Sequence, residues 1–208
     1  MALQRFRQTI DSEEELREIV GIPSKLVKNK VISHLDSHCK EFISKSPFLL
    51  MSTADEEGFC DVSPRGDQPG FVYILDDKHL IIPERPGNRR IDSMRNILSN
   101  ARTGLIFIIP GMEETLRVNG KATLVKDEDL LDKMKVNERK PLLAIGVEVE
   151  ECFIHCAKAF KRSGLWDADS WLEKEALPSA ANILSAHAKI PNEDVADLLE
   201  ESYTKRLY

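Results

Sequence analysis

The sequence lacks any run of apolar residues approaching the roughly 20 that a helix needs to cross a bilayer. Its first stretch, "MALQRFRQTIDSEEE", also lacks the apolar core of a signal peptide. Cysteine is scarce: there are four, without dense spacing, as expected in a reducing compartment. These absences predict a cytoplasmic protein with no membrane partner.

An excess of positive charge is missing as well. The net charge is −6 over 208 residues, whereas a general nucleic-acid binder shows a net basic patch. We therefore expect no nucleic-acid partner. With 42% hydrophobic and 31% charged residues, the chain has the composition of an ordinary globular protein. Its local basic clusters are interpreted as focused anion sites: Arg85, Arg89 and Arg90 in one, and Lys158, Lys161 and Arg162 in the other.

Hydrophobic patterning predicts three parts. Residues 1–45 are expected to form a helical extension, and residues 46–165 a β domain. Residues 166–208 are expected to form two helices, divided by Pro191, that pack on the same domain. No internal repeat and no low-complexity linker separates these parts.

The β domain is predicted to contain six or seven antiparallel strands. "PFLLMSTAD" and "FCDVSPRG" flank a turn, as in a hairpin, and "FVYILDDKHLIIP" repeats this form. Strands follow over Thr103 to Ile109 and Glu114 to Val125, and "PLLAIGVEVEECFIH" adds a long last strand. A single helix among so many strands favours a closed or partly closed barrel over a sandwich. The predicted fold is mainly β, of the α+β class, with peripheral helices.

The stretch "IIPERPGNRRIDSMRNIL" is the strongest candidate site. A turn at Asn88 leads to Arg89 and Arg90, where a helix is expected to begin. Backbone N–H groups and guanidinium groups at a helix N-terminus suit an anion, and a phosphate monoester is the best candidate. The alternative is a solvated first helical turn, although cations there oppose the helix dipole. The residues expected to face the core from this helix are Ile91, Met94, Ile97 and Leu98.

Several motifs in one order resemble a known family. "SPRGDQPGFVYILDDKHLIIPERPGNRRIDSMRNIL", "ETLRVNGKATLV" and "CFIHCAKAFKRSGLWD" together resemble the pyridoxamine 5′-phosphate oxidase-like, FMN-binding split β-barrel proteins. The resemblance implies a split barrel, a homodimer, and FMN held in clefts between the two subunits. We find no counterpart of the C-terminal Arg- and His-containing segment with which authentic pyridoxamine phosphate oxidases bind their substrate. The resemblance is therefore to a different branch of the family.

The resemblance also implies which residues contact FMN. Asn88, Arg89 and Arg90 match the pattern that grips the phosphate, with Arg65 helping to hold it. A strand over Gly70 to Val72 would line the ring with backbone groups, and a polar side chain before an "RVNG" turn, here Thr115, would reach its polar edge. In the alternative, Arg65 is a turn residue paired with Asp67, and Arg85 and Asn88 only shape a turn. The full expected set is Arg65, Gly70, Phe71, Val72, Arg85, Asn88, Arg89, Arg90, Thr115, Lys158, Arg162 and Trp166.

The segment after the last strand has two interpretations. Cys152, His155 and Cys156 suggest a metal or redox site, but there is no second cysteine pair, and a strand would point Cys152 and His155 to opposite faces. Buried free thiols and no bound metal are the simpler expectation. Trp166, with its neighbouring cations, is expected to meet the flavin and an anionic substrate across the dimer. The alternative is a surface loop packed by Trp166.

These expectations lead to a functional hypothesis. FMN supplies redox chemistry while the protein supplies position and electrostatics. The chain is therefore interpreted as an FMN-dependent oxidoreductase that exchanges hydride with a small molecule. One alternative is a non-catalytic FMN-binding or flavin-sensing protein. Another is a related split barrel that uses deazaflavin or haem.

Overall fold

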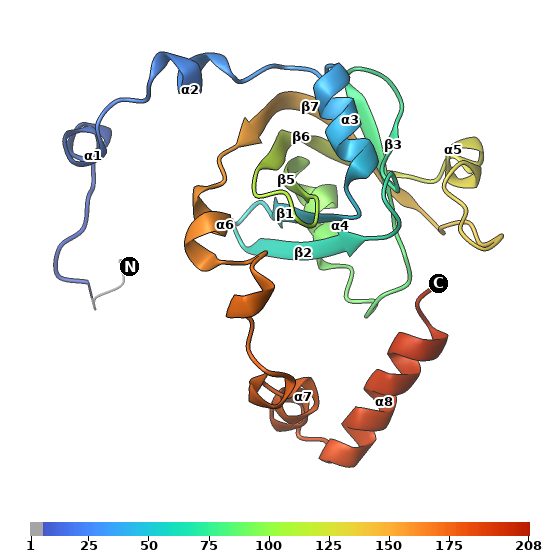
Figure 1. Cartoon of the computed structure of the whole chain (residues 1–208). Coiled ribbons are helices and arrows are strands. Elements are labelled where there is room, and N and C mark those ends of the chain that lie inside the picture. The colour runs from blue at the N-terminus through green and yellow to red at the C-terminus, as the bar shows by residue number, and fades with distance from the viewer. Residues whose placement is uncertain (1–5) are drawn as a thin grey trace. The chain divides into compact units, whose positions relative to one another are not determined.

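Seven antiparallel strands form one sheet in the order β2-β1-β5-β6-β7-β4-β3 (Figure 1). The sheet curls into a barrel that stays split, because within the described residues β2 pairs only with β1, and β3 only with β4. This confirms the predicted mainly β, α+β fold with peripheral helices. The strands are β1 (Phe48–Ala54), β2 (Cys60–Gly66), β3 (Tyr73–Ile74), β4 (His79–Pro83), β5 (Arg102–Ile108), β6 (Thr115–Val125) and β7 (Ala144–His155).

The computed structural model describes residues 6–208, and residues 1–5 of the predicted N-terminal extension lie outside it. The described residues up to Val31 form one unit, and Ile32–Tyr208 form a second. Across the described range, no helix has the length and apolar character that would let it cross a membrane. The helices are α1 (Glu13–Val20), α2 (Lys25–Asn29), α3 (Ser37–Lys45), α4 (Asp92–Ser99), α5 (Glu128–Asp132), α6 (Lys158–Ser163), α7 (Ala180–Ala188) and α8 (Asn192–Lys205), with 3-10 turns at Ala168–Ser170 and Lys174–Ala176.

The first unit contains α1 and α2, each begun by a serine. Ser12 Oγ accepts a hydrogen bond from the N–H of Glu15 at 3.2 Å, and Ser24 Oγ accepts one from Val27 at 3.4 Å. Gly21 ends α1 with φ 77°, a conformation that glycine adopts without steric cost. Neither helix buries a residue.

The two long strands, β6 and β7, hold the barrel together. They pair along almost their whole length, whereas β5 pairs with the first half of β6 and β4 with the first half of β7. Their register shifts between Asn119 and Gly120, which is a β-bulge. The "RVNG" segment is therefore not a turn, as the resemblance suggested, but lies inside β6. A turn here would have ended the pairing that continues to Val125.

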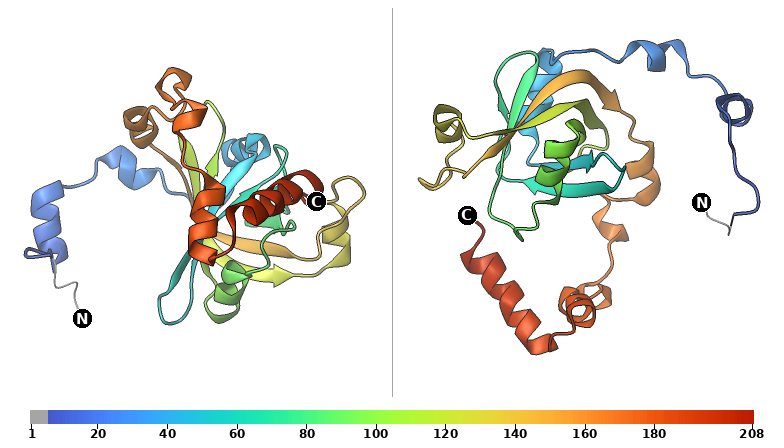
Figure 2. Two further views of the ribbon diagram at one scale, coloured as in Figure 1. Left: turned by 90° about the horizontal axis from the view of Figure 1, so that it is seen from below. Right: turned by 180° about the vertical axis from the view of Figure 1, so that it is seen from behind.

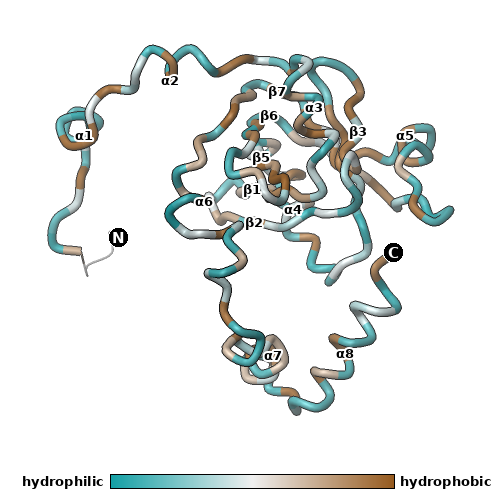
Figure 3. The backbone as a smooth tube through the Cα atoms, viewed as in Figure 1, coloured by the Kyte–Doolittle hydropathy of each residue, from teal (hydrophilic) through white to brown (hydrophobic). Residues whose placement is uncertain are grey.

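One hydrophobic core fills the barrel (Figure 3). Inward side chains alternate along the strands, for example Leu49 and Met51 in β1, both fully buried. The helix α3 covers this core with Cys39, Phe42 and Ile43. Strand alternation was visible in the sequence, which is why the predicted strands are confirmed to within one or two residues for most of the sheet.

Helix α4 buries fewer side chains than its pattern suggested. Ile97 is buried and joins the barrel core, and Met94 is half-buried. Leu98 is 76% exposed and Ile91 is 49% exposed, so the prediction that they face the core was wrong. Ile91 precedes the helix, and Ser93 occupies the buried position one turn before Ile97 instead.

The last part of the chain forms a helix pair. Helices α7 and α8 contact each other, and Asn192 Nδ2 donates to Asn182 Oδ1 at 2.6 Å (Figure 2). The two predicted tail helices are thus present, but α7 begins only at Ala180 because two 3-10 turns precede it. Val195 is the side chain that α8 buries. The predicted boundaries at residues 45 and 165 stay a prediction.

Candidate functional site

Two segments meet through reciprocal ion pairs. Arg65 lies near the end of β2 and pairs with Glu84, which follows β4. Asp67 lies just beyond β2, and its Oδ2 accepts a hydrogen bond from Arg85 Nε at 2.7 Å. The alternative in which Arg65 pairs with Asp67 was therefore wrong. The sheet brings Glu84 and Arg85 to the end of β2, where each finds a partner of opposite charge.

Arg65 carries an unused donor at this position. Its side chain is only 14% exposed, and its Nε is buried without a hydrogen-bond partner. A buried donor without a partner costs free energy, and such groups in folded proteins are uncommon. A ligand oxygen would satisfy it. Among the buried side-chain nitrogen and oxygen atoms of residues 6–208, this Nε alone has no partner.

The loop before α4 has an unusual backbone. Asn88 Oδ1 accepts a hydrogen bond from the N–H of Arg90 at 3.0 Å. Arg89 and Ile91 both adopt left-handed conformations, with φ of 60° and 57°. The helix therefore begins at Asp92, and the prediction that it begins at the two arginines was wrong, because a left-handed residue cannot continue an α-helix. Such conformations cost free energy in non-glycine residues and often occur at ligand sites.

The two arginines of this loop differ in their availability. Arg90 Nε donates to Asp92 Oδ2 at 2.7 Å, and this hydrogen bond raises the pKa of Arg90. Arg89 is exposed, and its guanidinium makes no hydrogen bond or ion pair with the described part of the chain. The N-terminus of α4 has no side-chain cap from Ile91. Arg89 is thus the loop cation that is free for an anion.

Helix α4 is fixed to the sheet by polar contacts that the sequence interpretation missed. Ser93 Oγ donates to Asp61 Oδ2 at 2.5 Å and lies 3.1 Å from Ser63 Oγ. Asn96 Nδ2 donates to Thr53 Oγ1 at 3.1 Å. Asp61 and Ser63 alternate with Arg65 on one face of β2, and this run of polar residues on one face was a signal available in the sequence.

The segment from Gly70 to Val72 is a loop, so the prediction of a strand there was wrong. Only Tyr73–Ile74 pairs with β4. Gly70 has φ 83°, and a Cβ there would lie 3.2 Å from the carbonyl oxygen of Ser44. Val72 is buried in the core, and Phe71 packs against it. These side chains support the site loop from below.

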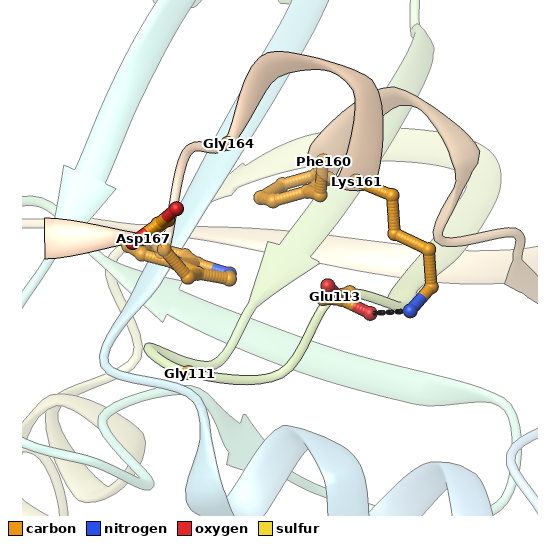
Figure 4. Close-up of a pocket in the computed structure, with 7 residues that line it drawn as sticks. Gly111, Glu113, Phe160, Lys161, Gly164 and Asp167 are labelled. Carbon is orange, nitrogen blue, oxygen red and sulfur yellow. Dashed lines mark ion pairs between the residues drawn. The ribbon is translucent and has the colours of Figure 1, made fainter. Parts of the chain in front are cut away.

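A second group of predicted residues lies around α6. Phe160 and Trp166 lie 5.8 Å apart between ring centroids, and Trp166 Nε1 donates to the carbonyl oxygen of Met112 at 2.9 Å. They line an open pocket of about 420 Å³ together with Gly111, Glu113, Lys161, Gly164 and Asp167 (Figure 4). The pocket's cation is Lys161, which pairs with Glu113 at 2.5 Å, and neither Lys158 nor Arg162 lines it.

Within one chain, the two groups of predicted residues are not brought together. Thr115 is buried and pairs with His155 across β6 and β7, so it belongs with the α6 group. In Figure 1, α6 and the loop before α4 lie on different sides of the barrel. No hydrogen bond or ion pair joins the two groups within residues 6–208.

The cysteines do not gather with histidine into a site. Cys152 is buried, and its Sγ donates to Cys39 Sγ at 3.3 Å, which lowers the pKa of Cys39 and raises that of Cys152. His155 and Cys156 are exposed, so the expectation of buried thiols holds for Cys152 and was wrong for Cys156. In the described range no three His, Cys, Asp or Glu side chains form a metal-binding group.

Comparison with known proteins assigns the family. The sequence profile of the family described as pyridoxamine 5′-phosphate oxidase matches residues 35–156, more than half of the chain. The chain belongs to this family. No curated protein matches.

Solved structures similar to this member of the pyridoxamine 5′-phosphate oxidase family share little sequence with it. HupZ of group A Streptococcus is 21% identical with a TM-score of 0.46, and the match covers 58% of this chain and 99% of HupZ. A putative pyridoxamine 5′-phosphate oxidase of Lactobacillus delbrueckii is 20% identical with a TM-score of 0.47, covering 59% and 95%. An FMN-binding protein of Syntrophomonas wolfei is 9% identical with a TM-score of 0.43, covering 56% and 88%.

The part that matches the pyridoxamine 5′-phosphate oxidase family includes one predicted group and excludes most of the other. Arg65, Arg85 and the loop up to Arg90 fall inside residues 35–156. The α6 residues and Trp166 fall beyond it. Family membership therefore concerns the barrel and the arginine-rich loop.

Proposed function

We propose that this chain binds FMN and is an FMN-dependent oxidoreductase that acts on a small molecule. The observation that carries this proposal is the buried, unpartnered Nε of Arg65 in a member of the pyridoxamine 5′-phosphate oxidase family. A phosphate monoester carries about −1.5 to −2 charges near neutral pH, and its oxygens accept hydrogen bonds from guanidinium groups. Arg65, Arg85 and Arg89 would hold this phosphate.

The residues at the site fit such an anion in three respects. Arg65 supplies a desolvated donor, and Arg89 an exposed cation without a protein partner. The left-handed backbone at Arg89 and Ile91 stores free energy that a bound ligand would help to offset. When bound, FMN supplies hydride exchange at N5 of its ring, while the chain supplies position and electrostatics.

The absorption spectrum of the purified protein, before and after addition of FMN, tests this proposal. We expect flavin bands and saturable quenching of FMN fluorescence, with one FMN per chain. A protein that neither carries nor binds FMN would overturn the proposal. So would a haem spectrum, or selective binding of a deazaflavin. Turnover of reduced flavin with an electron acceptor would then distinguish an oxidoreductase from a flavin sensor.

Arg89→Ala is expected to weaken FMN binding more than Arg90→Ala. A hydrogen bond to a charged group contributes about 1.5–3 kcal/mol, so loss of the free guanidinium should raise the Kd roughly tenfold or more. Arg90 is already engaged by Asp92, so its removal should have a smaller effect. Fluorescence titration of both variants measures the difference. Equal, unchanged affinities would show that this loop does not hold the phosphate.

We also propose that two copies of the chain form the complete site. The outer face of β1, β2 and β5 carries apolar side chains exposed in one chain, among them Phe48 (36%), Val62 (62%) and Ile106 (39%). These lie on neighbouring strands in register, and contiguous exposed apolar surface marks an interaction site. A dimer through this face is consistent with the α6 group of one chain completing the arginine site of the other.

Light scattering of the native protein is expected to give the mass of two chains. Val62→Glu places a charge in the centre of the apolar face and should shift the protein toward monomers, with weaker FMN binding. Leu142→Glu is the matched control, because Leu142 is 93% exposed and lies outside this face. A native protein that is monomeric when saturated with FMN would contradict the dimer.

A further inference from the structure

The segment that follows α8 returns to the arginine site. Arg139 Nη1 donates to the main-chain oxygen of Tyr208 at 2.5 Å, and Val195 anchors α8 with 5% exposure. The phenol of Tyr208 then donates to Asp67 Oδ1 at 2.8 Å, across 141 positions of sequence. In Figure 1 the end of α8 lies beside the barrel, next to the loop that precedes α4.

Asp67 connects this phenol to Arg85. The Asp67 side chain is 1% exposed, and both of its oxygens are engaged. Oδ1 accepts hydrogen bonds from the Gln68 N–H at 2.8 Å and from Tyr208, and Oδ2 accepts one from Arg85 Nε at 2.7 Å. The carboxylate also raises the pKa of Tyr208, because its hydrogen bond and charge favour the neutral phenol. The phenol therefore stays protonated and remains a donor.

This arrangement fixes the direction of one guanidinium. Nε of Arg85 is committed to Asp67, and within the described residues its two Nη groups make no hydrogen bond. A carboxylate held on both oxygens cannot rotate freely, so it holds the Arg85 fork in one orientation. The side chain of Arg85 is 16% exposed, so its free end can reach a ligand.

We propose that Tyr208 is a positioning residue for the phosphate group of the flavin, acting through Asp67 on Arg85. The inference rests on the proposed binding of FMN. Tyr208 itself does not touch the phosphate in this account. Its hydrogen bond orients Asp67, which orients Arg85, and Arg85 with Arg65 then binds the phosphate oxygens.

Tyr208→Phe tests this role, because it removes only the hydroxyl group. Loss of one hydrogen bond to a charged group should weaken FMN binding about fivefold to tenfold. Riboflavin has the same ring and ribityl chain without the phosphate, so its affinity should not change. A merely structural role of the hydroxyl would weaken the binding of both ligands. The loss should be measured by fluorescence quenching, with riboflavin and FMN titrated in parallel.

Tyr203→Phe is the matched control. Tyr203 lies in α8, is 62% exposed, and makes no hydrogen bond within residues 6–208, so its substitution should leave both affinities unchanged. Asp67→Asn should reproduce the phosphate-selective loss, since it removes the charge that holds Arg85. If the native protein binds FMN and Tyr208→Phe binds it equally well, or loses FMN and riboflavin alike, the positioning role is overturned. If the native protein binds no FMN, the proposed function and this inference both fall.

Discussion

Arg65→Ala is expected to reduce the affinity for FMN by about 3 kcal/mol, on the order of 100-fold in Kd. The expectation follows from the position of Arg65, whose Nε is buried without a protein partner beside the Glu84 ion pair. A guanidinium already withdrawn from water binds a phosphate more strongly than an exposed one does. Arg65→Lys should not restore binding, because an ammonium lacks the planar fork of donors. Fluorescence titration with FMN and riboflavin gives the comparison, and only FMN affinity should fall.

Two controls separate ligand binding from folding. Arg95→Ala removes an exposed arginine of α4 and should leave FMN affinity unchanged. The double variant Arg65→Ala and Glu84→Ala removes both charges of the ion pair. It should unfold at a higher temperature than Arg65→Ala alone, because it leaves no buried carboxylate unpaired, but it should not regain FMN binding. FMN affinity in Arg65→Ala equal to that of the native protein would show that the buried Nε does not face the phosphate.

Gly120→Ala is expected to lower the free energy of unfolding by about 3 kcal/mol or more, as severe overpacking does. A Cβ at Gly120 would lie 2.0 Å from the carbonyl oxygen of Glu148, a backbone atom in the adjacent strand β7. Glu148 cannot move away without disturbing its own pairing with His79 and Lys121. Urea unfolding followed by circular dichroism measures the difference from the native protein.

Gly104→Ala is the matched control for this substitution. A Cβ there would meet only the side-chain oxygen of Asn119 at 3.3 Å, and a side chain can move where a strand cannot. We expect a change below about 1 kcal/mol, as for an ordinary surface substitution in a strand. If Gly120→Ala and Gly104→Ala unfold at the same urea concentration, the close approach of β6 and β7 at the bulge does not limit stability.

The strands of the barrel could be predicted because their signal is local. Alternation of buried and exposed positions is a property of consecutive residues, and β4 was predicted with the bounds His79 and Pro83 that the structure has. The order of the motifs likewise indicated the family to which the chain belongs. The pairing of β1 with β5, across the whole of β2, β3 and β4, has no such local signal.

The candidate site was predicted less completely, for a physical reason that differs from residue to residue. The position of Arg65 in the chain suggested Asp67 as its partner, since Asp67 is two residues away. The structure pairs it with Glu84 instead, because the sheet brings the ends of β2 and β4 together. The left-handed backbone at Arg89 and Ile91 could not be predicted, because neither residue type favours it. The assignment of these residues to FMN stays a prediction.

The sequence by itself determined the class of fold, the family, and the stretch of chain in which an anion site should be sought. It did so because hydrophobic period, turn residues and motif order are all readable from neighbouring residues. Only the tertiary structure decided which arginines remain available to a ligand. Arg90 and Arg85 are engaged by carboxylates, whereas Arg89 is free and the Nε of Arg65 lacks a partner. The contact from Tyr208 to Asp67 also belongs to the tertiary structure, because only folding brings residues 141 positions apart within a hydrogen bond of each other.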